Sequence, residues 1–313
     1  MTEWPQTPFP PSHIHILGKR IIVVGVDGDF VFLDSSTLVS TSDSARPFPS
    51  SVQYSTVVDG LLIGTWTEYE LKIARMAALR TDVELSEGVD KAELRTGSEH
   101  EVPKVAGAIW SHALESEPLA MTSEGERIAF CTYKGGIYCI SPNSTELWRQ
   151  PLVEWPKLSK FPDGSHIVGI ASAPDPNDAS VQRIWVWGAA GGWAIYSWED
   201  GDLLDQGSLE VKLHLESVWG SEDGEWLLGF PPDNVARWRH GGEIEVATVN
   251  GPINDALWDE KGWSMTGWRE DLRWGSDGIQ QASRPEIGMS IYEHRKQGKL
   301  ILDNTGNWSR FQF

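Results

Sequence analysis

The sequence predicts an all-β fold made of seven similar units, and three observations support this prediction. A short polar turn that contains glycine recurs seven times, and four to six strand-forming residues follow it each time. A second strand-forming segment follows after a loop in most of the units. Helical periodicity is weak, and the one competing stretch, residues 69–80, falls in phase with the repeated strands.

The recurring turns are spaced as expected for a single repeated unit. Four of the intervals between their glycines (42, 39, 38 and 36 residues) lie near 40, and the two longer ones (65 and 60) indicate units with insertions. Glycine suits such turns because it adopts a positive φ without steric cost. The turn glycines are Gly18, Gly60, Gly125, Gly164, Gly224, Gly262 and Gly298.

Each unit contains enough segments for four short strands. One strand is predicted just before the turn glycine, as in residues 217–224 and 255–262, and a second follows the turn directly. The strand predicted after the next loop occurs at residues 29–34, 70–75, 136–141, 234–239, 271–276 and 307–313. A last strand carries a Trp-x-x-Pro/Ala-Leu pattern, as in residues 109–114 and 147–152. Four strands per unit of about 40 residues, repeated seven times, predict a seven-bladed β-propeller.

The two ends of the sequence predict how the first and last units meet. The last unit ends one strand short, and residues 2–6 precede the first unit with a Glu-Trp pair like that of other outer strands. We predict that this N-terminal strand closes the last blade, which would remove an exposed strand edge; a frayed tail is the alternative. Residues 1–313 are then expected to form a single domain, although the length alone suggests two.

The repeats resemble those of seven-bladed β-propellers of the WD40-like and quinoprotein-like superfamily. Residues 135–152, GGIYCISPNSTELWRQPL, are similar to the end of a quinoprotein-type blade. No unit carries the Gly-His and terminal Trp-Asp pair of a WD40 repeat, and Trp258-Asp259 stands in the wrong phase. The tryptophan pattern does not suffice for a bound quinone. The resemblance therefore implies a fold, and a fold does not define a function.

Two of the units are enlarged. Residues 81–105 are polar and acidic and are expected between the strands at residues 70–75 and 109–114 of the second blade, as a flexible surface excursion or a partner-docking segment. Residues 173–181 form an expected loop insertion in the fourth blade. That blade has an alternative phase, because residues 183–197 align with residues 127–141 at a constant offset of 56.

Charge and composition exclude several classes of protein. The net charge of −19 argues against nucleic-acid binding. No apolar stretch is long enough to cross a membrane, and the first residues lack the pattern of a signal peptide, so we expect a cytoplasmic protein without membrane insertion. The acidity is compatible with a basic partner and also with a saline habitat. The oligomeric state is not indicated.

The motifs of common catalytic sites are missing. The sequence has no Gly-x-Ser-x-Gly elbow, P-loop or His-Glu-x-x-His motif. His13 and His15 share one face of a predicted strand, but no further metal ligands stand at a suitable spacing. Cys131 and Cys139 are expected to be buried thiols, with a disulfide as the alternative. We therefore expect no catalytic residue, metal or cofactor.

The resemblance to propellers implies where a partner would bind. In such folds the loops between the second and third strands gather on one face, around the channel mouth. These loops are rich in carboxylates and contain aromatic side chains, which suits a basic peptide through charge steering and cation–π contacts; a hard cation such as Ca²⁺ is the alternative. The predicted partner-binding residues are Asp27, Asp29, Trp66, Glu68, Tyr133, Asp233, Trp268, Arg269, Glu270 and Asp271.

The expected function is that of a non-enzymatic scaffold that binds a protein or basic peptide through this acidic face. The alternative is a propeller enzyme, or a protein that binds a small ligand or metal at the channel mouth. Most of the 17 tryptophans fall at equivalent strand positions, so we expect them to pack between blades rather than to form a binding surface.

Overall fold

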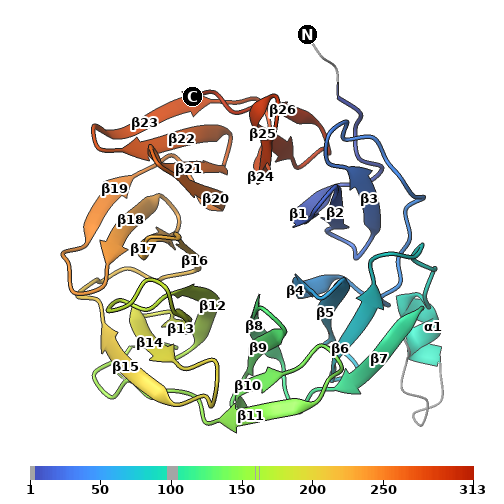
Figure 1. The fold of residues 1–313 in the computed structure, drawn as a ribbon, viewed down its shortest axis with the longest axis horizontal. Coiled ribbons are helices and arrows are strands. Elements are labelled where there is room, and N and C mark those ends of the chain that lie inside the picture. Colours follow the sequence, from blue (N-terminus) through green and yellow to red (C-terminus); the bar gives the residue numbers. More distant parts are fainter. Residues whose placement is uncertain (1–3, 97–104, 159, 162) are drawn as a thin grey trace. The chain divides into compact units, whose positions relative to one another are not determined.

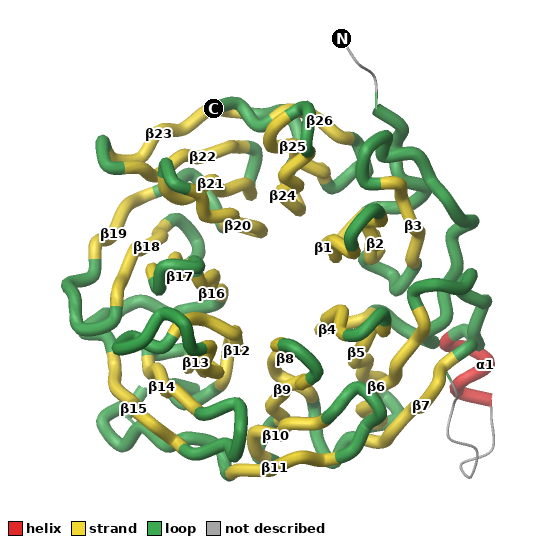
Figure 2. Tube along the Cα trace, viewed as in Figure 1, coloured by secondary structure: helices red, strands yellow, loops and turns green. Residues whose placement is uncertain are grey.

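The computed structural model describes residues 4–96, 105–158, 160–161 and 163–313. The chain divides into two compact units. Unit 1 comprises Met1–Glu117 and Pro285–Phe313, and unit 2 comprises Pro118–Arg284. Both units are built from antiparallel sheets whose strands follow one another along the chain, and the short helix α1 is the exception to this pattern among the described residues (Figure 1, Figure 2).

Unit 1 contains three sheets. Two have three strands and one has four, all in chain order. The strands are β1 (Pro11–Leu17), β2 (Arg20–Gly25) and β3 (Phe30–Asp34); β4 (Val52–Val58), β5 (Leu61–Glu68), β6 (Ile73–Arg80) and β7 (Ala108–Ala113); and β24 (Gly288–His294), β25 (Gly298–Asp303) and β26 (Trp308–Arg310). The stretch that competed as a helix in the sequence is therefore mainly the strand β6, as the repeat phase predicted.

Unit 2 contains four sheets of four strands. Within this unit the first strands β8, β12, β16 and β20 lie on one side, and the last strands β11, β15, β19 and β23 lie on the other (Figure 1). The strands are β8 (Pro118–Glu124), β9 (Arg127–Thr132), β10 (Gly136–Ile140), β11 (Glu146–Gln150), β12 (Ile167–Pro174), β13 (Gln182–Gly188), β14 (Gly192–Tyr196), β15 (Leu203–Ser208), β16 (Ser217–Gly220), β17 (Glu225–Phe230), β18 (Asn234–Arg239), β19 (Glu245–Thr248), β20 (Ile253–Asp259), β21 (Gly262–Gly267), β22 (Glu270–Gly275) and β23 (Gly278–Ser283).

Six of the seven predicted turn glycines lie at or next to the turn between the first and second strands of a sheet, and all six have a positive φ. Gly164 is the exception because it precedes the first strand β12. The fourth blade follows the alternative phase: β13 and β14 correspond to β9 and β10, in agreement with the offset of 56 residues. The insertion at 173–181 consequently includes the connection between β12 and β13.

The insertion at residues 81–105 lies between β6 and β7, the third and fourth strands of its sheet, which correspond to the strands expected at residues 70–75 and 109–114. It contains α1 (Lys91–Thr96). Asp90 and Glu93 cap this helix reciprocally, because the side chain of each accepts a hydrogen bond from the backbone N–H of the other. Leu94 and Val105 are buried in the core of unit 1, so part of this polar insertion packs against the sheets.

The structure does not show the predicted N-terminal strand. The sheet of β24–β26 has three strands, and residues 4–10 form none. Thr7 donates a backbone hydrogen bond of 2.9 Å to Gly306 O, and Trp4 packs against the core of unit 1. Thr2 and Glu3, which belong to the predicted strand, lie outside the described residues. The N-terminal segment therefore meets the C-terminal sheet through a short contact.

Aromatic side chains fill the space between neighbouring sheets of unit 2. Trp185, Trp187 and Trp193 come from β13 and β14, and Trp226 and Trp238 come from β17 and β18. All five are buried, and the indole pairs across the two sheets have ring centroids 5.0–6.3 Å apart. The prediction that these repeated tryptophans pack between blades is confirmed for this cluster.

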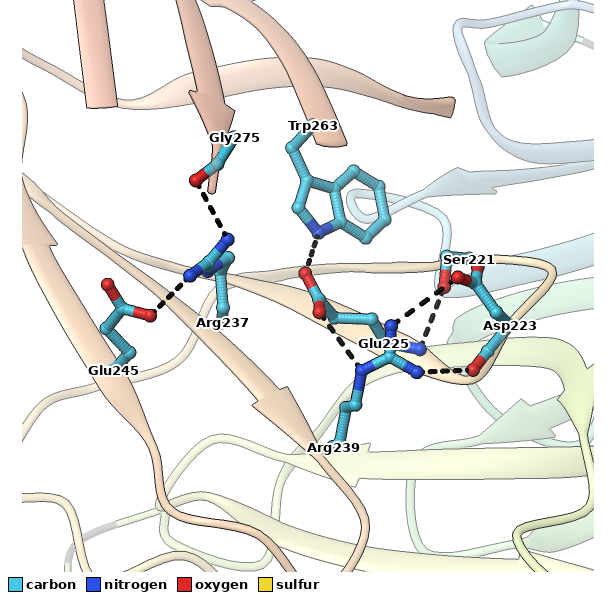
Figure 3. A network of polar contacts seen from close by, with 8 residues as sticks. All are labelled: Ser221, Asp223, Glu225, Arg237, Arg239, Glu245, Trp263 and Gly275. Atoms are coloured by element: carbon cyan, nitrogen blue, oxygen red, sulfur yellow. Dashed lines mark hydrogen bonds and ion pairs between the residues drawn. The ribbon is translucent and has the colours of Figure 1, made fainter. Parts of the chain in front are cut away.

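A buried carboxylate links the next pair of sheets. Glu225, at the start of β17, accepts hydrogen bonds from Trp263 Nε1 at 3.0 Å and from Arg239 Nε at 3.1 Å (Figure 3). Arg237 reaches the same neighbouring sheet, where it donates to Gly275 O and lies over the ring of Trp274. Partners on both sheets compensate the charge of Glu225, which makes its burial tolerable.

We predict that Trp263→Phe destabilises the protein by about 1.5–3 kcal/mol beyond the loss of packing, because it removes a hydrogen bond to a buried charged group. Chemical denaturation followed by far-UV circular dichroism measures this change.

Trp226→Phe is the matched control, because Trp226 is equally buried and its Nε1 has no hydrogen-bond partner among the described residues. Equal losses for the two variants would contradict the role given to the Trp263–Glu225 bond.

Candidate functional site

Four of the predicted partner-binding residues are buried within strands. Trp66 and Glu68 belong to β5, whose hairpin loop begins only at residue 69, and Glu270 and Asp271 begin β22. These strands are buried at consecutive positions, so a residue that lies in the strand instead of the adjoining loop becomes buried. These four residues contribute internal contacts in the structure.

Asp271 forms an enclosed ion pair with Arg284. Arg284 Nη1 lies 2.6 Å from Asp271 Oδ1 and 2.7 Å from Oδ2, and both side chains are almost inaccessible to solvent. Thr266 Oγ1 donates to the same carboxylate at 3.0 Å. Glu270 accepts hydrogen bonds from the backbone and side chain of Asn250. Both carboxylates therefore fix the start of β22 against neighbouring segments.

The other predicted residues lie in loops and are accessible to different degrees. Tyr133, Asp233, Trp268 and Arg269 are exposed at the hairpins between the second and third strands of three sheets in unit 2. These residues occupy the loops in which the sequence placed them. The two from unit 1 are Asp27, which is exposed, and Asp29, which pairs with Arg46 at 2.8 Å.

His13 and His15 lie on the same face of β1, as predicted, and meet Ser55 of β4. Each Nε2 lies 2.7 Å from Ser55 Oγ. Ser12 Oγ donates to Val24 O, so it accepts from Nδ1 of His13, which leaves Nε2 of His13 to accept from Ser55 and Nε2 of His15 to donate to it. Burial lowers the pKa of His13 to about 4 and, with repulsion from His13, that of His15 to about 3.

Cys131 and Cys139 are free and buried, as expected. They stand diagonally across the β9–β10 pair, since Cys131 is opposite Ile137 and Cys139 is opposite Ala129. Burial raises the pKa of Cys131 to about 12 and that of Cys139 to about 11, so both remain protonated and unreactive near neutral pH.

A cavity of about 580 Å³ opens in unit 2 between the β9–β10 hairpin and the connection from β11 to β12. Its volume is typical of ligand and peptide pockets. Two exposed aromatic side chains, Tyr133 and Phe161, line it together with Lys134 and His166. The Tyr133 and His166 rings have centroids 6.3 Å apart.

The connection that forms one wall of this cavity is anchored to the core. Trp155 is buried and donates from Nε1 to Trp193 O at 3.1 Å, and Leu158 is buried in the same cluster. Successive turns follow, in which Phe161 N donates to Leu158 O and Gly164 N donates to Phe161 O. This anchoring holds Phe161 at the surface beside the β9–β10 hairpin.

The charged groups of the cavity are available to a ligand. The side chains of Glu154 and Asp163 are exposed, and neither has a hydrogen-bond or ion-pair partner among the residues that the structure describes. The sequence identified Tyr133 but not Glu154, Phe161, Asp163 or His166. Asp163-Gly164 has the composition of a repeat turn, so the sequence analysis took it for one and missed the long connection to which it belongs. The unusually long interval of 60 residues from Gly164 to the next turn glycine, Gly224, was the signal that could have revealed this error.

No group of three or more His, Cys, Asp or Glu side chains among the described residues is arranged to hold a metal ion. Within the same part of the chain, no helix is long and apolar enough to cross a membrane.

Comparisons with known proteins identify the fold. No family model matches the sequence, and neither does any curated protein. The β-propeller domain of Cps50 (Swd1) from Myceliophteria thermophila is 10% identical, with 98% of this chain and 97% of that chain covered and a TM-score of 0.67. The WD40 β-propeller domain of Doa1 is 9% identical, with coverage of 99% and 96% and a TM-score of 0.63.

A third similar structure is the extracellular domain of the putative one-component system BT4673 from B. thetaiotaomicron. It is 12% identical over 100% of this chain and 40% of that chain, with a TM-score of 0.61. The chain thus has the fold of a seven-bladed β-propeller that resembles WD40 propellers, which confirms the resemblance stated from the repeats. At these identities the likeness shows the fold alone.

We predict that Arg284→Met destabilises the protein by about 3–5 kcal/mol, because it leaves Asp271 buried without its counter-charge. Denaturant titration measures the loss. Arg80→Met is the control, since the Arg80–Asp82 pair is exposed and such pairs contribute about 0–1 kcal/mol. The double variant Asp271→Leu/Arg284→Met should recover much of the stability, and equal losses for Arg284→Met and Arg80→Met would refute the assignment.

We predict that the histidine cluster makes the protein less stable in acid. The pKa of each histidine is lower in the folded state than its unfolded value of about 6.5, so the unfolded state binds more protons below that pH. The free energy of unfolding should fall between pH 6.5 and 4 by about 1.4 kcal/mol per pH unit for each histidine.

His13→Asn/His15→Asn should flatten this pH dependence, measured by denaturation at a series of pH values. His214→Asn, at an exposed histidine, is the control. A slope that is the same in all three proteins would contradict the prediction.

Proposed function

We propose that this protein is a non-enzymatic interaction scaffold that binds a segment of a protein partner in the cavity between the β9–β10 hairpin and the β11–β12 connection. One observation carries the proposal: exposed Tyr133 and Phe161 stand beside carboxylates that have no partner among the described residues, in a cavity of about 580 Å³. WD40-like propellers commonly bind proteins, which supports this class of function.

The aromatic side chains of the cavity are suited to be anchors of recognition. Tyr133 is 43% exposed and Phe161 is 50% exposed, although both lie next to a core that is closely packed. Rigid aromatic side chains offer a large contact area at a low entropic cost, and a few such residues carry most of the energy of a typical interface. The anchored backbone around Phe161 limits the ordering that a partner must impose.

The remaining accessible residues of the predicted face extend this proposal. Asp233, Trp268 and Arg269 belong to equivalent hairpins of unit 2, and we assign them to the outer part of the partner surface. Asp27 and Asp29 belong to unit 1 and stay predictions from the sequence alone. The buried residues Trp66, Glu68, Glu270 and Asp271 hold their own strands in this proposal.

We further propose that residues 2–6 supply the outermost strand of the last blade, next to β26. The bond from Thr7 N to Gly306 O and the bond from Gln6 Nε2 to Thr305 O at 2.8 Å support it, because both bring the N-terminal segment to the turn before β26. Protection of backbone amides in β26 from hydrogen exchange, lost on deletion of residues 2–6, tests this closure.

We predict that Tyr133→Ala/Phe161→Ala weakens the binding of captured partners by at least about tenfold, because loss of an aromatic anchor typically costs more than about 1–2 kcal/mol. Proteins captured by the intact chain are identified, and the affinity of each is then measured for the purified variant.

Tyr69→Ala/Phe313→Ala is the matched control, since it removes an exposed tyrosine and an exposed phenylalanine that do not line the cavity. Partners that bind the Tyr133/Phe161 variant as tightly as the wild type would refute the cavity as the binding site.

A further inference from the structure

We propose that the cavity selects a basic side chain, arginine or lysine, of the partner segment, and that Lys134 of this chain competes for the same position. The proposal rests on the proposed function and specifies the chemistry of its ligand. Two independent observations lead to it: a cation already placed on the Tyr133 ring, and the carboxylates that the β11–β12 connection contributes to the cavity.

The chain's own lysine occupies the exposed ring. Lys134 Nζ lies 4.9 Å from the centroid of the Tyr133 ring, within the range of a cation–π contact. No other contact of the Lys134 side chain is found among the described residues. The electron-rich face of Tyr133 is thus accessible to a cation, and a neighbouring residue on the same loop holds it in the absence of a partner.

The conformation of Lys134 is unfavourable for a lysine. Its φ is +57°, in the left-handed region that favours glycine and asparagine. The next position, Gly135, has no room for a side chain, because a Cβ there would lie 2.1 Å from Thr132 Oγ1. Lys72 and Arg269 share this conformation in other hairpins, so the contact with the Tyr133 ring is what distinguishes Lys134.

The carboxylates that the β11–β12 connection contributes to the cavity favour a positive charge. Glu154 and Asp163 both line it and are exposed without a hydrogen-bond or ion-pair partner in the described part of the chain. The single Lys134 does not balance these two carboxylates. A guanidinium or ammonium group would contact the ring of Tyr133 and meet the carboxylates, while its methylene stem packs along Phe161. An acidic side chain would be repelled, and a neutral one would leave both carboxylates uncompensated.

The test uses acetylated and amidated pentapeptides Ala-Ala-X-Ala-Ala, in which X is arginine, lysine, citrulline or leucine. Citrulline has nearly the shape of arginine without its charge. Their dissociation constants are measured by saturation-transfer NMR with the intact chain. We expect the arginine and lysine peptides to bind more tightly than those with citrulline and leucine, and Tyr133→Ala to abolish this preference.

Removal of Lys134 should strengthen the binding of basic peptides. Lys134→Gly and Lys134→Gln should lower the dissociation constant of the arginine peptide about two- to fivefold, the range of an exposed cation–π contact, without tightening the leucine peptide. Two control variants separate the causes. Lys72→Gly relieves a lysine with a similar φ of +53° in another hairpin, and Lys160→Gln removes a charge from the β11–β12 connection without altering the cavity lining.

The outcomes distinguish this inference from the function on which it rests. Leucine and arginine peptides that bind equally well, with partners still lost on Tyr133→Ala/Phe161→Ala, would overturn the selection of a basic side chain and leave the scaffold proposal intact. An equal gain from Lys160→Gln would overturn the competition by Lys134. Absence of binding by every peptide to both the wild type and Lys134→Gly would overturn the inference as a whole.

Discussion

The structure depends on the packing of short sheets against one another within each unit. Strands of three to eight residues form sheets too small to be stable alone, so each sheet must bury its apolar faces against a neighbour. The second strands show this requirement most clearly, because residues 21–24 of β2 and 225–230 of β17 are buried at successive positions and hence on both faces. Large flat side chains such as Trp185 and Trp226 fill the space that twisted sheets leave between them.

This packing determines where polar groups are tolerated. Glu225 and Asp271 are enclosed between strands and depend on fixed donors, Trp263 and Arg239 for the first and Arg284 for the second. Such groups restrict the register of neighbouring elements and offer little to a partner. In the proposed function, recognition falls to the hairpins and connections, where Tyr133, Lys134 and Phe161 line the cavity.

Much of the fold could be predicted from the sequence, because glycine-containing turns followed by short strand-forming segments leave a local signal. Gly18, Gly60 and Gly262 illustrate it, since each lies in a turn between the first and second strands of a sheet. The signal failed where another turn had the same composition: Asp163-Gly164 precedes β12 and shifted the phase of the fourth blade.

The candidate site was less predictable, since it depends on contacts between segments. Trp66 and Glu68 were expected in a loop that in fact begins at residue 69, and the contact of Lys134 with Tyr133 has no signature beyond two adjacent residues. The cavity could not be predicted without knowing where the β11–β12 connection lies. The burial of Trp155 and Leu158 in the core sets that position, and no sequence motif indicates it.

The tryptophans are distributed unequally between the two units, and this has an optical consequence. Those of unit 1 are Trp4, Trp66, Trp110 and Trp308, so 13 of the 17 belong to unit 2. Indole rings 5–6 Å apart, as in the pairs formed by Trp226, couple their electronic transitions and give intense near-ultraviolet circular dichroism. The intrinsic fluorescence and aromatic dichroism of this protein will therefore report chiefly the packing within unit 2.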